Sequence, residues 1–159
     1  MTDFDARLDA ATTPEEAWRA LQDLAQSTVG ARLFTVTVLD MDAMLARRAY
    51  SSDEASYPAA GTKPITRNAF FDRIHGEGKP FVANTLEEMG FPDIDLIGSL
   101  GCGSVVNLPI VHDGDLVATM NILHEAGHYT PERVARTVDD LTAPARAAYV
   151  RARSLGPLL

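Results

Sequence analysis

Cysteine is almost absent from this chain: Cys102 is the only one among 159 residues. A single cysteine excludes an intrachain disulfide framework, a Cys-x-x-Cys redox pair and a zinc site rich in thiolates. Thiol chemistry would therefore rest on Cys102, with any second thiol supplied from outside the chain. A lone cysteine is more often a small, inert core residue than a reactive group.

Positive charge is also scarce, with 14 Lys and Arg residues against 22 Asp and Glu residues and a formal net charge of −8. A protein that binds nucleic-acid backbones needs clustered cations to displace counterions, so this composition argues against a nucleic-acid partner. No apolar run approaches the roughly 20 residues of a membrane span, and the acidic start "MTDFD" is unlike a secretory signal. We therefore expect a cytoplasmic protein that uses neither nucleic acid nor a membrane.

Two segments begin with the same helix-start signal. "TPEE", from Thr13, offers a capping hydroxyl, a proline for the first turn and an acid at the capping-box position. "TPE", from Thr130, repeats the order of capping hydroxyl, proline and acid. Apolar residues then recur at helical spacing. They are Ala17, Trp18, Leu21, Leu24 and Ala25 in the first segment, and Val134, Val138, Leu141, Ala145 and Ala148 in the second. We expect one helix that ends near Gly30 and a long C-terminal helix that Pro144 kinks.

Between these helices the apolar period changes to two, which indicates strands. Residues 32–40, "RLFTVTVLD", form one predicted strand, and "ARRAYSSD" forms a shorter second one. "NLPIVHDGDLVATMNILHEAG", residues 107–127, predicts a hairpin around Asp113-Gly114. With 46% hydrophobic residues the chain has the size and composition of one domain, so we expect a single α+β domain over 1–159, built on an antiparallel sheet.

The middle of the chain predicts less regular structure. "EASYPAAGTKPI", residues 54–65, is a predicted long loop, and long loops in compact domains often cover sites. We then expect a short helix in "RNAFFDRIHGEGKP" ending near Gly76, a short strand in "FVANT", and a helical or irregular connection over residues 86–103.

The hairpin carries polar residues among apolar ones, and a buried polar group must be hydrogen-bonded or face a ligand. A tight Asp113-Gly114 turn predicts a register in which Val111 faces Leu116 and Val106 faces Asn121. Alternation then gives one face with Ser104, Val106, Thr119 and Asn121, and an opposite face with Asn107, Met120 and Ile122. Small polar groups on an apolar floor are typical of a small-molecule pocket.

These patterns predict a ligand-binding site of nine residues. The polar floor would be Thr35, Thr37, Ser104, Thr119 and Asn121, with His124 at the rim where the strand ends. An inward Arg48 would hold a carboxylate or phosphate, Tyr50 and Tyr57 would form an aromatic wall, and Lys63 would be part of the lid.

Each of these residues also has an ordinary structural interpretation. The threonines would form local hydrogen bonds, and Arg48 would form a surface salt bridge. His124 would be a packed, hydrogen-bonded ring, and for Asn121 a local partner and a ligand both remain open. We expect no metal site, because His124 and His128 have i, i+4 spacing but lie at a strand end and turn, not on a helix.

The segment "NLPIVHDGDLVATMNILHEAGHYTPE" resembles the C-terminal half of a GAF domain, a small ligand-sensing module of signalling proteins. The likeness covers a core of about residues 13–149. It implies a central antiparallel sheet with the N- and C-terminal helices packed on one face and a ligand pocket under loops and short helices on the other. It also implies a homodimer formed through the terminal helices, for which Trp18, Leu21 and Leu24 are the candidate interface residues. The alternative for Trp18 is a place in the core of the domain.

Two functional hypotheses of different classes follow from this resemblance. The first is a sensory module without catalytic machinery, which binds an unidentified small molecule and changes the packing of its terminal helices. We expect no output domain after "RARSLGPLL", so a separate output protein is the expected partner. The second is a redox enzyme like the free methionine-R-sulfoxide reductases, using Cys102; those enzymes rely on several cysteines, at positions that Cys102 does not match.

Other activities of GAF domains fit less well, and no cofactor is predicted. The Asn-Lys-Phe-Asp-Glu signature of cyclic-nucleotide-binding members is absent from the chain. The region that corresponds to the bilin attachment site, "FPDIDLIG", contains neither the cysteine nor the histidine that such a site needs.

Overall fold

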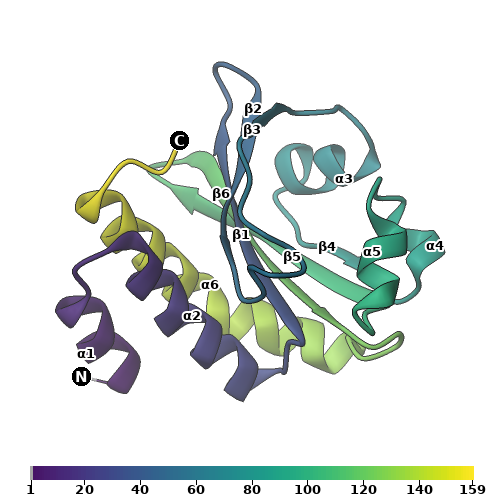
Figure 1. Ribbon diagram of the computed structural model, residues 1–159, viewed down its shortest axis with the longest axis horizontal. Helices are drawn as coiled ribbons and strands as arrows, with labels where there is room; N and C mark the ends of the chain where they lie inside the picture. Colours follow the sequence, from purple (N-terminus) through teal and green to yellow (C-terminus); the bar gives the residue numbers. More distant parts are fainter. Residues whose placement is uncertain (1) are drawn as a thin grey trace.

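The computed structural model describes residues 2–159. Its elements are α1 (Asp3–Ala10), α2 (Pro14–Thr28), β1 (Leu33–Asp40), β2 (Leu45–Ser51), β3 (Thr62–Pro64), α3 (Ala69–Phe71), a π-helical turn η1 (Asp72–Gly76), β4 (Phe81–Ala83), α4 (Leu86–Met89), α5 (Ile94–Ser99), β5 (Ser104–His112), β6 (Asp115–His124) and α6 (Pro131–Leu155). The strands form one six-stranded sheet in the order β3-β2-β1-β6-β5-β4, and every neighbouring pair is antiparallel. Helices α1, α2 and α6 lie on one side of the sheet, and α3, α4 and α5 lie on the other (Figure 1). The predicted α+β architecture is confirmed.

Both predicted helix starts are confirmed by their caps. The Thr13 side chain accepts a hydrogen bond from the Glu16 amide, and the Thr130 side chain accepts one from the Arg133 amide. Helix α6 continues through Pro144 as far as Leu155. Helix α1 was not expected from the sequence, although Thr2 and Asp5 form a capping box at its start. Among the described residues, no helix is both long and apolar enough to span a membrane.

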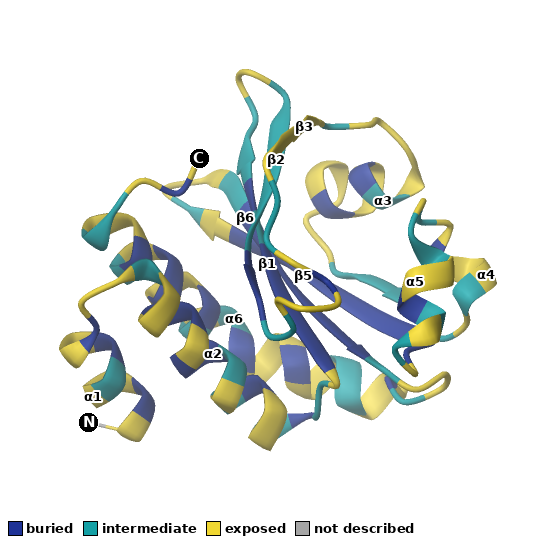
Figure 2. Cartoon of the chain, viewed as in Figure 1, coloured by how far each residue is buried: buried dark blue, intermediate teal, exposed yellow. Residues whose placement is uncertain are grey.

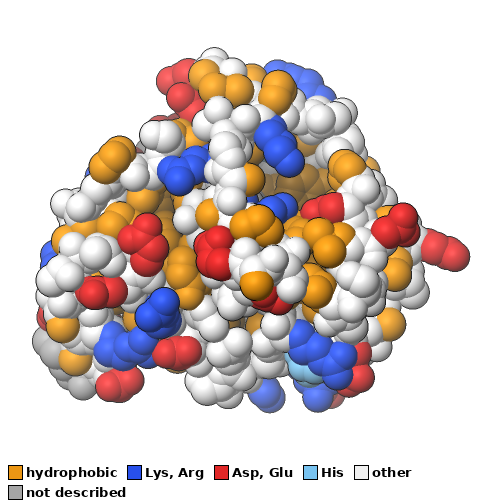
Figure 3. Space-filling model, viewed as in Figure 1, with side chains coloured by type: hydrophobic (Ala, Val, Ile, Leu, Met, Phe, Trp, Pro, Cys, Tyr) orange, Lys and Arg blue, Asp and Glu red, His pale blue; other side chains and the backbone are white. Residues whose placement is uncertain are grey.

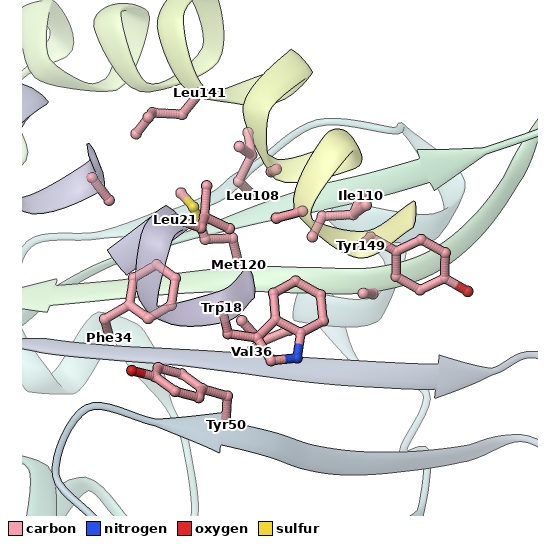
Figure 4. Close-up of a cluster of buried hydrophobic side chains, with 14 of the residues drawn as sticks. Trp18, Leu21, Phe34, Val36, Tyr50, Leu108, Ile110, Met120, Leu141 and Tyr149 are labelled. Atoms are coloured by element: carbon pink, nitrogen blue, oxygen red, sulfur yellow. The ribbon is translucent and has the colours of Figure 1, made fainter. Parts of the chain in front are cut away.

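The main core lies between the sheet and helices α2 and α6 (Figures 2 and 4). Trp18 and Leu21 of α2 point into it, together with Phe34 of β1 and Met120 of β6, and each is at most 1% exposed. Burial of this much apolar surface is the largest favourable contribution to folding. The core alternative for Trp18 is therefore confirmed, and Trp18 and Leu21 do not lie at a dimer interface, because the core of this domain already buries both side chains.

A smaller cluster lies on the opposite side of the sheet, under α4 and α5. It contains Leu33, Tyr57, Ala83, Met89, Ile97, Cys102, Val105 and Leu123. Cys102 is 4% exposed within it. The sheet is therefore covered on both faces, as its apolar composition predicts.

Two shifts of strand register decide which side chains reach each face. Between β1 and β2, Val36 pairs with Tyr50 but Thr37 pairs with Arg48, so Arg48 and Tyr50 do not share a face. A β-bulge of this kind reverses the alternation beyond it.

The second shift lies in the hairpin, between Ile110 and Val111. Val111 pairs with Leu116 as predicted, but Asn107, not Val106, pairs with Asn121. The expected register was therefore wrong by one residue along most of β5. As a result Val106 faces the helices and Asn107 faces the opposite side.

Candidate functional site

A cavity of about 390 Å³ lies on the sheet face opposite α2 and α6. Strands β1, β2, β5 and β6 form its floor, and the loop around Tyr57, residues 63–74 and residues 91–97 cover it. Figure 3 shows the opening as a hollow lined mainly by hydrophobic side chains, with charged side chains near its rim. Its size falls within the usual range of small-molecule pockets.

The polar floor of the cavity is one chain of hydrogen bonds across three strands. Asn107 Nδ2 donates to Asn121 Oδ1 at 2.7 Å. Asn121 Nδ2 in turn lies 3.1 Å from each of the Thr35 and Thr37 hydroxyl oxygens and donates to both. The three strands bring these residues into adjacent positions, since Thr35 pairs with Asn121 and Asn121 with Asn107. The buried amides therefore largely satisfy one another.

One atom at the end of this chain has no partner. Asn107 is 5% exposed, and its Oδ1 accepts no hydrogen bond within the described part of the chain. On its other side Asn107 pairs with Phe81 of β4, whose side chain has no polar atom. A buried acceptor without a donor costs on the order of 1–3 kcal/mol.

A charged group stands at one edge of the cavity. The Arg48 guanidinium lies 3.8 Å from the centroid of the Tyr57 ring, donates to the Pro58 carbonyl at 2.9 Å, and lies 3.7 Å from the Asp93 carboxylate. The Tyr57 hydroxyl also donates to Asp93. Burial raises the pKa of Tyr57, and its hydrogen bond to Asp93 raises that pKa further, so the hydroxyl stays protonated and holds the loop against residue 93.

Aromatic rings form another wall of the cavity, beside Phe81 of β4. Phe70, Phe81 and Phe91 contact one another with ring centroids 5.4 to 5.8 Å apart, and Phe70 and Phe91 line the cavity. Phe70 comes from α3 and Phe91 from the turn before α5, so segments far apart in the sequence build this wall. A planar ring fits against such a surface.

The structure brings six of the nine predicted ligand-binding residues to this cavity. They are Thr35, Thr37, Arg48, Tyr57, Thr119 and Asn121. Lys63, predicted to be part of the lid, lines it as well. That these residues bind a ligand remains a prediction.

The other three predicted residues lie outside the cavity. The Tyr50 hydroxyl donates to Gln22 of α2, and its ring packs against Phe34, because the bulge in β2 turns it toward the helices. Ser104 donates to the carbonyls of His124 and Glu125, on the face to which the shifted register of β5 assigns it.

His124 is the third, and it points toward the helix side of the sheet. Its ring stacks on His128 with 3.7 Å between centroids, beside Gly30 at the end of α2. Alternation along β6 accounts for this, because Asn121 and Leu123 face the cavity and His124 follows them by one residue.

Sequence reasoning missed Asn107, Asp93 and the phenylalanine wall. Asn107 was assigned to the wrong face because the bulge between Ile110 and Val111 carries no clear sequence signal. Phe91 and Asp93 lie in "GFPD", a short turn that combines an aromatic and an acidic residue. This composition was the sequence signal that could have indicated a contribution to the cavity.

The comparisons with known proteins agree with this architecture. The family model of the GAF domain matches residues 13–140, which is more than half of the chain. The chain belongs to the GAF domain family. No curated protein matches this GAF domain at a significant level.

Solved structures resemble this GAF domain in fold. The GAF domain of a two-component sensor histidine kinase from Bacillus halodurans superimposes with a TM-score of 0.72 at 12% identity, covering 92% of this chain and 100% of that one. The GAF domain of a phosphoenolpyruvate-protein phosphotransferase from Coxiella burnetii gives 0.67 at 16% identity, covering 95% and 92%. Free methionine-R-sulfoxide reductase from Neisseria meningitidis, in complex with its substrate, gives 0.61 at 15% identity, covering 96% and 87%.

Cys102 of this GAF domain does not line the cavity. It is buried in the smaller cluster, and burial raises the pKa of its thiol, an effect that the nearby Arg32 only partly opposes. A protonated, buried thiol is a poor nucleophile.

The stacked histidines of this GAF domain form a second polar cluster with Glu125. The three side chains bring potential ligand atoms within 4.8 Å of one another. Arg32 lies 3.7 Å from the Glu125 carboxylate, and the Arg133 guanidinium donates to the His128 carbonyl at 2.9 Å. Two guanidinium groups beside the cluster oppose the binding of a divalent cation.

Proposed function

We propose that this chain is a small-molecule-binding sensory GAF module without catalytic machinery of its own. The observation that carries the proposal is the cavity of about 390 Å³, whose walls are mainly apolar and whose buried amides and hydroxyls converge on one floor. Pockets with this composition bind small organic molecules. Its ligand-contacting residues would be Thr35, Thr37, Arg48, Tyr57, Asn107, Thr119 and Asn121.

The route from ligand to signal runs through strands β1 and β6. On β6, Asn121 lines the cavity, while its neighbours Met120 and Ile122 are 0% exposed in the core beneath α2 and α6. A ligand that favours one position of β6 therefore also favours one packing arrangement of the helices. Such coupling needs only a difference in ligand affinity between the two arrangements.

The proposed output is a change at the outer surface of α2 and α6, read by a second copy of this chain or by a separate partner protein. Trp18 and Leu21 are buried and cannot form that contact. Val138 and Val150 of α6 are 37% and 38% exposed, and with the partly buried Leu24 of α2 they offer apolar surface for a homodimer. Light scattering over a range of concentrations measures whether the dimer forms.

Native mass spectrometry of gently purified protein, followed by denaturing analysis of released molecules, tests the proposal. We expect a stoichiometric small molecule on the wild type and its loss from an Asn121→Leu variant. Asn84→Leu is the matched control, because Asn84 is an amide outside the cavity that donates to the Tyr129 carbonyl. The control should retain the molecule.

An empty cavity would contradict this proposed function. A wild-type protein that carries no small molecule, and whose melting temperature no member of a metabolite library raises, contradicts the proposal. The hydrogen-bonded amides would then serve only the fold, and the domain would act as an interaction scaffold.

A redox function through Cys102 has less support. The thiol lies outside the cavity, is 4% exposed, and is the only cysteine of the chain. The likeness to the methionine-R-sulfoxide reductase, at 15% identity, reflects the shared fold. A Cys102→Ser variant with reduced turnover of free methionine sulfoxide would favour the redox alternative over the sensory module.

A further inference from the structure

We propose that the ligand of this cavity is a neutral, planar molecule with an amide-type edge, whose N–H donates to Asn107 Oδ1. This inference rests on the proposed small-molecule site and assigns Asn107 as the residue that selects the ligand. It starts from Asn107 Oδ1, a fully buried amide oxygen on the cavity floor to which none of the described residues donates.

The hydrogen-bond chain on the floor determines what Asn107 has left to offer. One Nδ2 hydrogen of Asn107 is used by Asn121 Oδ1, and the Asn121 amide is used by the two threonine hydroxyls. An asparagine amide has two N–H donors and one carbonyl, so Asn107 retains its Oδ1 and one N–H. Oδ1 can therefore accept a hydrogen bond from a ligand N–H, and the remaining Nδ2 hydrogen can donate to a ligand carbonyl.

Among residues 2–159, the surroundings of Asn107 provide no donor for Oδ1. Its strand neighbours are Asn121, which is already paired, and Phe81, which is apolar. The cover over this end of the cavity includes Phe70, Ile74 and Phe91, all without polar side-chain atoms. A hydrogen-bond donor that enters the cavity would satisfy this acceptor.

The same features argue against an anionic group at this end of the cavity. A carboxylate or phosphate has only acceptor oxygens when ionised, so it could accept the remaining N–H of Asn107 but would leave Oδ1 without a donor. The Arg48 charge stands at another edge, where Asp93 lies 3.7 Å away and the Pro58 carbonyl accepts a hydrogen bond at 2.9 Å. The aromatic rings of Phe70 and Phe91 favour a flat body instead.

Titration with a matched pair of probes tests the inference. The probes are 2-quinolone, which has the N–H beside a carbonyl on a flat ring, and N-methyl-2-quinolone, which lacks the donor. Protein NMR shift titrations give both dissociation constants. We expect the wild type to prefer 2-quinolone by about tenfold, the change in affinity for roughly one neutral hydrogen bond at a buried acceptor.

Variants separate the hydrogen bond from the extra bulk of the methyl group. In Asn107→Leu, and in Asn107→Ala should the leucine variant fold poorly, the preference for 2-quinolone should disappear. In the control Asn84→Leu the preference should remain, because Asn84 also has an unpartnered buried Oδ1 but lies outside the cavity.

The outcomes distinguish this inference from the function on which it rests. Equal binding of the two probes to the wild type, or a preference that persists in both Asn107 variants, overturns the amide-edge inference and leaves a small-molecule site in place. Binding of neither probe overturns the inference, and an empty native mass spectrum with no stabilisation by the metabolite library overturns the proposed function itself.

Discussion

On β1, the side chains of Phe34, Val36 and Val38 face α2 and α6, whereas those of Thr35 and Thr37 face the cavity. The three helix-facing side chains are at most 2% exposed and contact other apolar groups. The two threonines instead accept hydrogen bonds from a buried amide beside an open volume of about 390 Å³.

The two faces of this one strand differ in how their side chains are packed. The helix side is close-packed, so removal of any large side chain leaves a cavity there. The opposite side keeps a cavity in the native fold, and its polar atoms are positioned by one another. A strand that has both faces can transmit a change from one to the other.

The largest expected effect compares two phenylalanines, one from each side. Phe34→Ala should lower the free energy of unfolding by about 3–5 kcal/mol, because the side chain is fully buried in the close-packed core. Phe70→Ala should cost only about 1 kcal/mol, since Phe70 is half-buried in the cavity cover and contacts Phe81 and Phe91. Urea denaturation measures both; equal losses would contradict the distinction between the faces.

Breaking the amide chain on the cavity floor should have an intermediate effect. Asn121→Leu leaves Asn107 Nδ2 and the two threonine hydroxyls without their partner and should cost about 1–3 kcal/mol. Thr119→Val is the control on the same strand, because the Thr119 hydroxyl makes no hydrogen bond with the described residues, and it should cost less. If urea denaturation gave Asn121→Leu the same free energy of unfolding as the wild type, the amide chain would contribute little to the stability of the fold.

Removing the Tyr57 hydroxyl should act locally. Tyr57→Phe breaks the contact with Asp93 and should cost about 1 kcal/mol while amides over residues 54–60 exchange faster with deuterium. Tyr50→Phe is the matched control on the helix side, where the hydroxyl donates to Gln22. Faster exchange at residues 54–60 in both variants would contradict a specific role for Tyr57 in closing the cavity.

The smallest expected effect is a pH dependence at the stacked histidines. Burial, followed by the neighbouring His128 and Arg32, lowers the pKa of His124 below its ordinary value of 6.5. The unfolded chain then binds a proton at His124 more readily than the folded chain does. The contribution of His124 to the free energy of unfolding is therefore fully present above pH 6.5, and it is lost as the pH falls from 6.5 through the lower pKa of the folded state. His124→Gln should flatten urea-derived stability in that window; an unchanged slope would assign the dependence to other groups.

Local sequence signals predicted much of the fold. The Thr-Pro-acid starts at residues 13 and 130, the two-residue period of β1 and the Asp113-Gly114 turn are all confirmed, because each depends on a few neighbouring residues. Thr35, Thr37 and Asn121 were assigned to the cavity face for the same reason. Helix α1 and β3 were missed, since both are short and depend on contacts with the rest of the domain.

What the sequence determined by itself is the order of the elements and the alternation within each uninterrupted strand, since backbone geometry fixes both locally. The tertiary structure decided the rest through strand pairing. One bulge turned Tyr50 toward Gln22, and another brought Asn107 to the cavity in place of Val106. A bulge is a relation between two strands, so neither strand's own pattern reveals it, and the unpaired Asn107 oxygen becomes visible only when β4, β5 and β6 lie side by side.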